Sequence, residues 1–128
     1  MYEFNVTLDL PFDHALQSVQ EALAGEKLGI ISDVDVQAIF RQKMAKSIRS
    51  YRILGVCSPP LADRVISAEP NAGTLLPCNL ILRGTDDDKT VVSFMDPVPV
   101  LGLSENPEVR AVAAEARDKL QRVIARLA

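Results

Sequence analysis

The sequence predicts an α+β domain in which a mixed sheet of about five strands packs against helices. Residues 2–10 alternate apolar and polar side chains, which is the period-two pattern of a strand with one buried face. Residues 109–127 instead repeat apolar side chains every three or four positions, as a helix lying on a sheet does. Two β-rich runs around a polar loop predict a hairpin, which argues against a purely parallel sheet.

The first third of the chain alternates strands and helices. After the strand over residues 2–10, Asp13 is placed to cap a helix and Gly29 provides its stop. Residues 30–34 are short and β-branched, so they predict a second strand. Asp35 follows at the position of a helix cap. This segment therefore predicts two strand–helix pairs.

A third strand and helix follow in the middle of the chain. Residues 51–57 are rich in β-formers and predict the strand. The Ser58 hydroxyl is expected to cap the next helix, in which Pro59 occupies a first position that tolerates a missing N–H. That helix is expected to end near Ala68, before the turn chemistry of residues 70–73.

The last part of the chain predicts the hairpin and a long closing helix. Residues 80–83 and 90–95 should be antiparallel neighbours, whereas the prolines of segment 96–99 remove donors and forbid regular strand pairing. Asn106-Pro107 opens a helix that runs to about Leu127. The predicted order is β-α-β-α-β-α-β-β-α in a single domain of residues 1–128, without repeats or long linkers.

Composition excludes several classes of function. The net charge of −3 and the isoelectric point near 5.1 supply no general attraction to nucleic acid or to an anionic membrane. The first ten residues resemble no signal peptide, and no apolar stretch is long enough for a membrane span. We therefore expect a cytoplasmic protein with no nucleic-acid or membrane partner. In that compartment its two cysteines are expected to be free thiols.

Four segments together resemble a known protein family. They are Val34–Gln37, Tyr51–Ala62, Leu76–Asn79 and Val91–Pro97, and over nearly its whole length the chain is similar to the bacterial and archaeal domain of unknown function 302 family. The resemblance implies a curved sheet backed by helices, a geometry related to TATA-binding-protein-like folds, and commonly a homodimer. It implies no established reaction. Many members have a Gly-Asn-Pro-like segment in place of residues 57–59, so any chemistry at Cys57 would belong to a subset.

Cys57 gives the sharpest chemical signal in the sequence. It lies just before a predicted helix N-terminus, where amide donors and the helix dipole favour a thiolate and make it a candidate catalytic nucleophile. The more common alternative is a small buried hydrophobe in an apolar strand, and we favour it. Cys78 becomes a redox partner of Cys57 only if the third and fourth strands bring those ends together. The sequence leaves that geometry open.

A basic segment gives the best hint of a binding site. No acidic residue occurs between Asp35 and Asp63, whereas five basic residues do: Arg41, Lys43, Lys46, Arg49 and Arg52. An anion would meet the Arg52 guanidinium and the helix amides after Ser58 if folding brings them together. Solvation of these charges is the favoured alternative. The candidate ligand-binding residues are therefore Arg52, Cys57, Ser58 and Cys78.

Other polar residues have simpler explanations than a metal or cofactor site. His14, the only histidine, is expected at the surface. Asp33 and Asp35 are close enough in sequence to share a cation, but capping already explains Asp35. The acidic run 86–88 lacks the alternating ligands of a calcium loop and suits a solvated hairpin tip. We expect neither a metal nor a cofactor.

Three functions remain after these exclusions. The leading hypothesis is a non-enzymatic binding or interaction domain whose sheet and last helix enclose a small apolar or anionic ligand near a dimer interface. The first alternative is a thiol-dependent redox or nucleophilic enzyme that uses Cys57, with Cys78 resolving an oxidised intermediate. The second alternative is a homo-oligomeric scaffold that pairs through an exposed strand edge or through residues 98–103.

Overall fold

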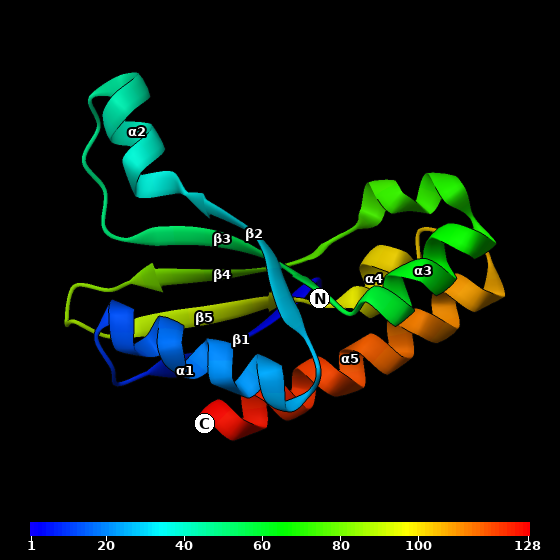
Figure 1. Cartoon of the computed structure of the whole chain (residues 1–128). Coiled ribbons are helices and arrows are strands. Elements are labelled where there is room, and N and C mark those ends of the chain that lie inside the picture. Colours follow the sequence, from blue (N-terminus) through cyan, green and yellow to red (C-terminus); the bar gives the residue numbers. More distant parts are fainter.

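The computed structural model describes residues 1–128 and contains one five-stranded sheet with helices on one face and at both ends (Figure 1). The elements in chain order are β1 (Glu3–Leu8), α1 (Phe12–Gly25), β2 (Gly29–Asp35), α2 (Val36–Met44), β3 (Tyr51–Cys57), α3 (Pro59–Ala68), the 3-10 helix η1 (Pro70–Leu75), β4 (Cys78–Gly84), β5 (Thr90–Met95), α4 (Pro97–Leu101) and α5 (Pro107–Leu127). The predicted α+β class and the predicted order of strands and long helices are confirmed. The structure adds η1 and α4, which the sequence did not predict.

The sheet is antiparallel throughout, whereas the sequence predicted a mixed one. Its strand order is β1-β5-β4-β3-β2, and every neighbouring pair is antiparallel. Helix α2 joins β2 to β3, and α3 with η1 joins β3 to β4, so each helical segment returns the chain to an adjacent antiparallel strand. The predicted hairpin of β4 and β5 is confirmed.

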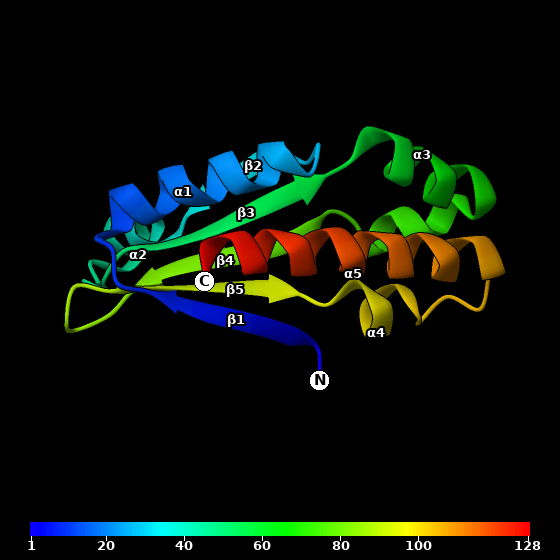
Figure 2. The same ribbon diagram turned by 90° about the horizontal axis from the view of Figure 1, so that it is seen from below.

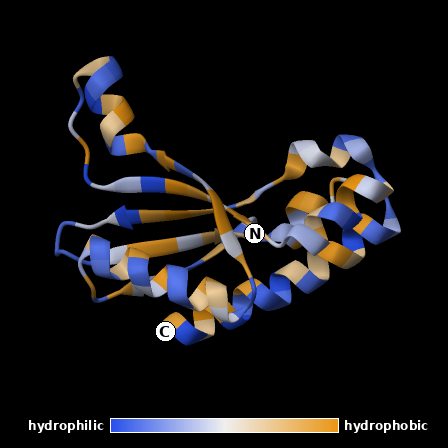
Figure 3. Ribbon diagram, in the orientation of Figure 1, coloured by the Kyte–Doolittle hydropathy of each residue, from blue (hydrophilic) through white to orange (hydrophobic).

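The main core lies between the sheet and the helices α1 and α5 (Figure 2). Strand alternation directs Leu54, Leu80 and Phe94 to this face, and all three are buried. Phe94 stacks on Phe4 with 5.7 Å between the ring centroids. Both hydrophobic and hydrophilic residues occur along α1 and α5, as expected of helices with one buried stripe (Figure 3). No helix lies across the opposite face of the sheet (Figures 1 and 2).

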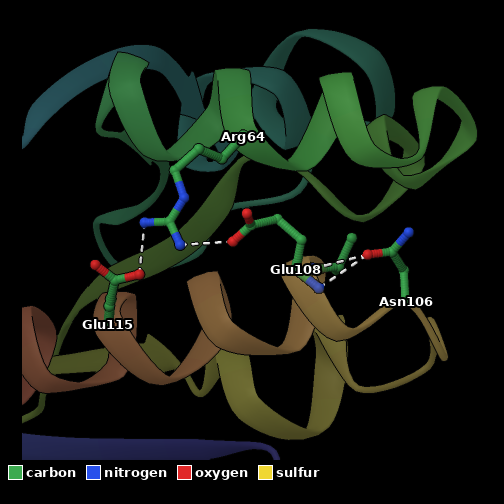
Figure 4. Close-up of polar contacts among 5 residues, drawn as sticks. Arg64, Asn106, Glu108 and Glu115 are labelled. Atoms are coloured by element: carbon green, nitrogen blue, oxygen red, sulfur yellow. Dashed lines mark hydrogen bonds and ion pairs between the residues drawn. The ribbon is translucent and has the colours of Figure 1, made fainter.

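A second, smaller core lies beyond the end of the sheet, where α3, η1, α4 and the first half of α5 meet (Figure 1). Val65, Leu101 and Val109 are among its fully buried side chains. Arg64 of α3 donates hydrogen bonds to two carboxylates of α5, with 2.7 Å from its Nη2 to Glu108 Oε1, and the second bond reaches Glu115 (Figure 4). Helix α5 therefore spans both cores.

Asn106 caps α5, because its side-chain oxygen accepts hydrogen bonds from the backbone N–H groups of Glu108 and Val109 (Figure 4). Pro107 follows at the first helical position, as predicted. The cap fixes the start of the helix that crosses both cores.

Two other predicted helix caps are wrong and one is confirmed. Asp35 accepts a hydrogen bond from the Ala38 N–H and caps α2 as predicted. Helix α1 begins earlier than predicted, after Pro11, so Asp13 lies inside its first turn and is no cap. Ser58 stands at the N-cap of α3 but its hydroxyl makes no capping bond. Pro59 and Pro60 occupy the first two helical positions and have no backbone N–H, so they cannot donate the capping hydrogen bond that the Ser58 hydroxyl oxygen would accept.

No helix of the structure has the length and apolar character needed to cross a membrane.

Candidate functional site

An apolar cavity lies where the two hydrophobic cores meet. Leu28, Val56 and Leu120 reach it from the main core, and Val65, Leu101 and Val112 reach it from the smaller one. Its volume is about 40 Å³. Twelve of its fourteen lining residues are hydrophobic; beyond those six, the lining comprises Cys57, Ser58, Leu61, Ala62, Leu76, Pro77, Cys78 and Ala116. Imperfect packing between two separately formed cores accounts for this cavity.

Local sequence explains how each wall of the cavity is built. Strand β3 runs directly into α3, so Cys57 and Ser58 lie at the junction of two elements. On the far side, α5 contributes Val112, Ala116 and Leu120, which are spaced four residues apart and therefore lie on one helix face. The cavity thus sits between the end of the sheet, α3 and the middle of α5.

The two cysteines are brought together by the antiparallel pairing of β3 and β4. Cys78 lies opposite Val56 in the strand register, one position away from Cys57 and close enough for the Cys57 charge to affect its pKa. Both thiols are free and both line the cavity. The sequence left this geometry open, and the strand order decides it. Either thiol is therefore available to the same occupant.

Burial makes both thiols poorer acids than ordinary cysteines. Desolvation raises the pKa of Cys57. Desolvation also raises the pKa of Cys78 to about 11, with a smaller contribution from the neighbouring Cys57 charge. These shifts are opposite to the thiolate stabilisation that a helix N-terminus was expected to give. Burial therefore favours the neutral form of both thiols over the thiolate, which is the nucleophilic form.

Arg52 and Ser58 do not form the anion site that the sequence suggested. The Arg52 Nη1 atom lies 2.9 Å from Asp33 Oδ2, and its Nη2 atom lies 3.8 Å from Asp35 Oδ2. The guanidinium is therefore engaged at the β2–β3 edge and does not line the cavity. Ser58 does line it and is buried. Of the four candidate binding residues, the structure brings together Cys57, Ser58 and Cys78.

Other polar residues singled out in the sequence lie apart from the cavity. His14 is exposed on α1. Asp86 pairs with Arg49, and Thr85 donates a hydrogen bond to Asp87 at the tip of the β4–β5 hairpin. No group of three or more His, Cys, Asp or Glu side chains is placed to hold a metal ion.

Comparison with known proteins places the chain in a family. A family model described as Domain of unknown function DUF302 matches residues 4–127. The chain belongs to the DUF302 family. Its fold is similar to the crystal structure of an uncharacterized conserved DUF302 protein from Bacillus stearothermophilus, with 23% identity, a TM-score of 0.90 and coverage of 100% of this chain and 99% of that one. No curated protein matches.

Sequence reasoning missed most of the cavity wall of this DUF302 chain. Leu61, Leu76 and Leu101 come from α3, the segment after η1, and α4, which are far apart in sequence. The available signal was the apolar residues in short segments outside the predicted strands and long helices, which indicate a second group of buried side chains. Their convergence depends on α3 and α4 both packing against α5, which local patterns do not encode.

We expect alkylation of Cys78 in folded protein to follow a pKa near 11. In the Cys57→Ser variant, which removes the smaller contribution of the Cys57 charge but keeps the burial of Cys78, the iodoacetamide rate should keep rising well above pH 9.0, whereas the rate in denatured protein should level off near the ordinary pKa. A folded protein that keeps this thiol protonated loses stability as pH rises from 9.0 to about 11, because the unfolded thiol ionises first. A native rate that levels off below pH 8 would contradict the expected pKa.

Proposed function

We propose that this DUF302 domain is a non-enzymatic binding module for a small apolar molecule or the apolar end of a larger one. The observation that carries this proposal is the cavity at the junction of β3, α3 and α5, in which twelve of fourteen lining residues are hydrophobic. Such a site excludes charged ligands from its interior, because burying an unpaired charge costs far more than an apolar contact returns.

The size of the cavity limits what it holds. Cavities of about 150 Å³ bind benzene or xenon, whereas a water needs about 10–15 Å³. The cavity here, of about 40 Å³, suits a short alkyl group or a single small apolar molecule. Its polar groups are the Ser58 hydroxyl and two protonated thiols, which offer weak hydrogen bonds but no charge.

The same features argue against the enzymatic alternative. A cysteine nucleophile needs a lowered pKa or an adjacent base, and desolvation raises the pKa of Cys57. No His, Asp, Glu or Lys lines the cavity beside that thiol. Binding therefore accounts for the lining better than covalent catalysis does.

A thermal-unfolding titration with dissolved xenon tests the binding function. A probe that binds only the folded state stabilises it by about 2.7 kcal/mol at one hundred times its Kd. We expect a rise in Tm in the natural chain and none in Ala116→Leu, because this substitution fills the cavity from α5. Ala114→Leu is the matched control, since Ala114 is exposed on the same helix.

Equal xenon stabilisation in Ala116→Leu and Ala114→Leu would contradict binding in the cavity. Circular dichroism shows whether each variant folds. If Ala116→Leu does not fold, Ala62→Val fills the same cavity from α3 with less added volume.

A second candidate function, homodimerisation, is favoured by the arm formed by β2 and α2 (residues 29–44). Strand β2 is a sheet edge without a single buried residue, and α2 also has none. Ile31 and Val34 are 60% and 41% exposed on the strand, and Met44 is 57% exposed on the helix. An open edge with exposed apolar side chains invites pairing with another strand. We propose that a second copy of the chain covers this arm.

Sedimentation equilibrium tests the dimer. We expect Val34→Lys to weaken self-association at least tenfold, because it places a charge in an apolar contact beside the open edge. Leu103→Lys is the control, since Leu103 is 76% exposed and lies outside the arm. A natural chain that remains monomeric at millimolar concentration would rule out this interface.

A further inference from the structure

A second hollow lies on the face of the sheet that no helix covers. It has a volume of about 370 Å³, which falls in the range of small-molecule sites. Its floor spans β1, β5, β4 and β3, and its lining residues are Tyr2, Glu3, Asn5, Tyr51, Asn79, Ile81, Arg83, Val91, Ser93 and Met95. Figure 1 shows α2 rising at one end of this face and the group of α3, η1 and α4 at the other. The hollow is therefore separate from the apolar cavity.

The strand register sets out this hollow in rows. Tyr51, Arg83 and Val91 are paired across β3, β4 and β5, so they lie side by side at one end. The next row on the same face contains Ile81 and Ser93. Along a strand, neighbouring residues on one face are about 7 Å apart. Asn79 is four residues before Arg83 in β4 and therefore lies about 13 Å from it. In the middle row Ile81 lies beside Ser93 and Asn5, whereas Val91 lies at the Arg83 end and Met95 lies opposite Glu3 at the other end.

Arg83 is a cation without a partner in the protein. Six other arginines pair with carboxylates: Arg49, Arg52, Arg64, Arg117, Arg122 and Arg126. Arg110 donates to the backbone oxygens of Gly102 and Ser104. Arg83, which is exposed, makes neither kind of contact, and Arg41 on α2 is the one other arginine without such a partner. Tyr51 and Val91 flank Arg83 in the strand register and give its guanidinium apolar neighbours.

The only acid that lines the hollow is already engaged. Glu3 accepts hydrogen bonds from the Asn5 amide at 3.0 and 3.1 Å, and it belongs to β1, two strands away from Arg83. Asn79 and Ser93 have no side-chain hydrogen bond in the protein, so they remain available to a ligand. Glu3 therefore lies at the Met95 end of the floor, and Arg83 is the one cation that lines the hollow.

We propose that this face binds a small organic carboxylate, with its carboxyl group on Arg83 and its apolar body on Ile81 and Val91. A guanidinium accepts a planar carboxylate in a two-bond geometry, which selects an acid over a neutral analogue. The apolar side chains of Ile81 and Val91 next to Arg83 select a hydrocarbon or aromatic body over a simple inorganic anion. This site does not depend on the cavity or on the proposed dimer.

The chain carries a built-in probe of this site. It has no tryptophan and only two tyrosines, and both Tyr2 and Tyr51 line the hollow. Tyrosine fluorescence therefore reports on this face, whereas the apolar cavity contains no tyrosine. Hexanoate is a suitable ligand probe because it does not absorb where tyrosine does, and hexanamide is its neutral counterpart.

We expect hexanoate to change the tyrosine fluorescence of the full chain in a saturable manner, and hexanamide to bind at least tenfold more weakly. Arg83→Gln should weaken hexanoate binding about tenfold or more, the range of a lost charge-assisted bond. Arg41→Gln is the matched control, because it removes the same charge from α2 and should leave the affinity unchanged. Ala116→Leu should also leave it unchanged, since that residue lines only the cavity.

Three outcomes would overturn the proposal. The first is equal binding of hexanoate and hexanamide, and the second is equal loss of affinity in Arg83→Gln and Arg41→Gln. The third is a tyrosine signal that changes with protein concentration but not with hexanoate, because a second copy would then cover this face.

Discussion

Replacing Phe94 with alanine is expected to lower the free energy of unfolding by about 3–5 kcal/mol. Phe94, the next-to-last residue of β5, is 0% exposed, and its ring stacks on Phe4 of β1 at 5.7 Å. It also faces Leu80 across the β4–β5 pair, so truncation empties the middle of the main core. Removal of a buried aromatic ring loses both its transfer free energy and the contacts of the cavity walls.

Urea unfolding followed by circular dichroism measures this loss. The control is Leu103→Ala, because Leu103 is 76% exposed and its truncation should change stability by no more than about 0.5 kcal/mol. A loss below about 1 kcal/mol in Phe94→Ala would show that the two strands do not depend on this ring.

The elements that were predicted correctly have signals that are local in sequence. Strand β1 shows its alternation within six residues, and α5 shows its apolar stripe and its Asn106-Pro107 start without reference to any other segment. Asp35 was recognised as a cap because its hydrogen bond to Ala38 N–H spans only three residues. Such features need no knowledge of how elements pack.

The parts that were not predicted depend on segments far apart in the chain. The sequence predicts helices between β2 and β3 and between β3 and β4. It does not show whether the strand after each helix runs parallel or antiparallel to the strand before it. That choice decides both the antiparallel order and the proximity of Cys57 to Cys78. Arg83 could not be predicted as a candidate binding residue, because the sequence does not show which side chains surround it in the folded sheet.

The expected thiolate at Cys57 illustrates how a local rule is overridden by its surroundings. The helix after this residue does begin where predicted, but its first two residues, Pro59 and Pro60, carry no N–H groups. Fewer backbone N–H groups are therefore available at the start of α3 to stabilise a negative charge on Cys57. Burial then raises the pKa of the thiol, so the two prolines and the apolar wall act in the same direction.

Gly55→Val is expected to destabilise the protein by about 2–3 kcal/mol. Gly55 is buried in β3, and a Cβ atom placed there would meet Pro77 Cγ at 2.8 Å and also the Ser32 hydroxyl oxygen. The Ser32 side chain can rotate away, whereas the ring of Pro77 is rigid and precedes Cys78 in the cavity wall. Guanidinium unfolding of the natural chain and of the variant measures the difference.

A double-mutant cycle separates the two neighbours of Gly55. If Pro77 carries most of the cost, Gly55→Ala should be less destabilising in a Pro77→Ala background than in the natural chain, whereas a Ser32→Gly background should change its cost little. The same contact links the open face to the cavity, because Pro77 touches Gly55 and also lines the cavity. Gly55→Ala should therefore alter xenon stabilisation as well as folding. An unchanged xenon response, together with an equal cost in all backgrounds, would show that the strand yields at Gly55 without moving Pro77.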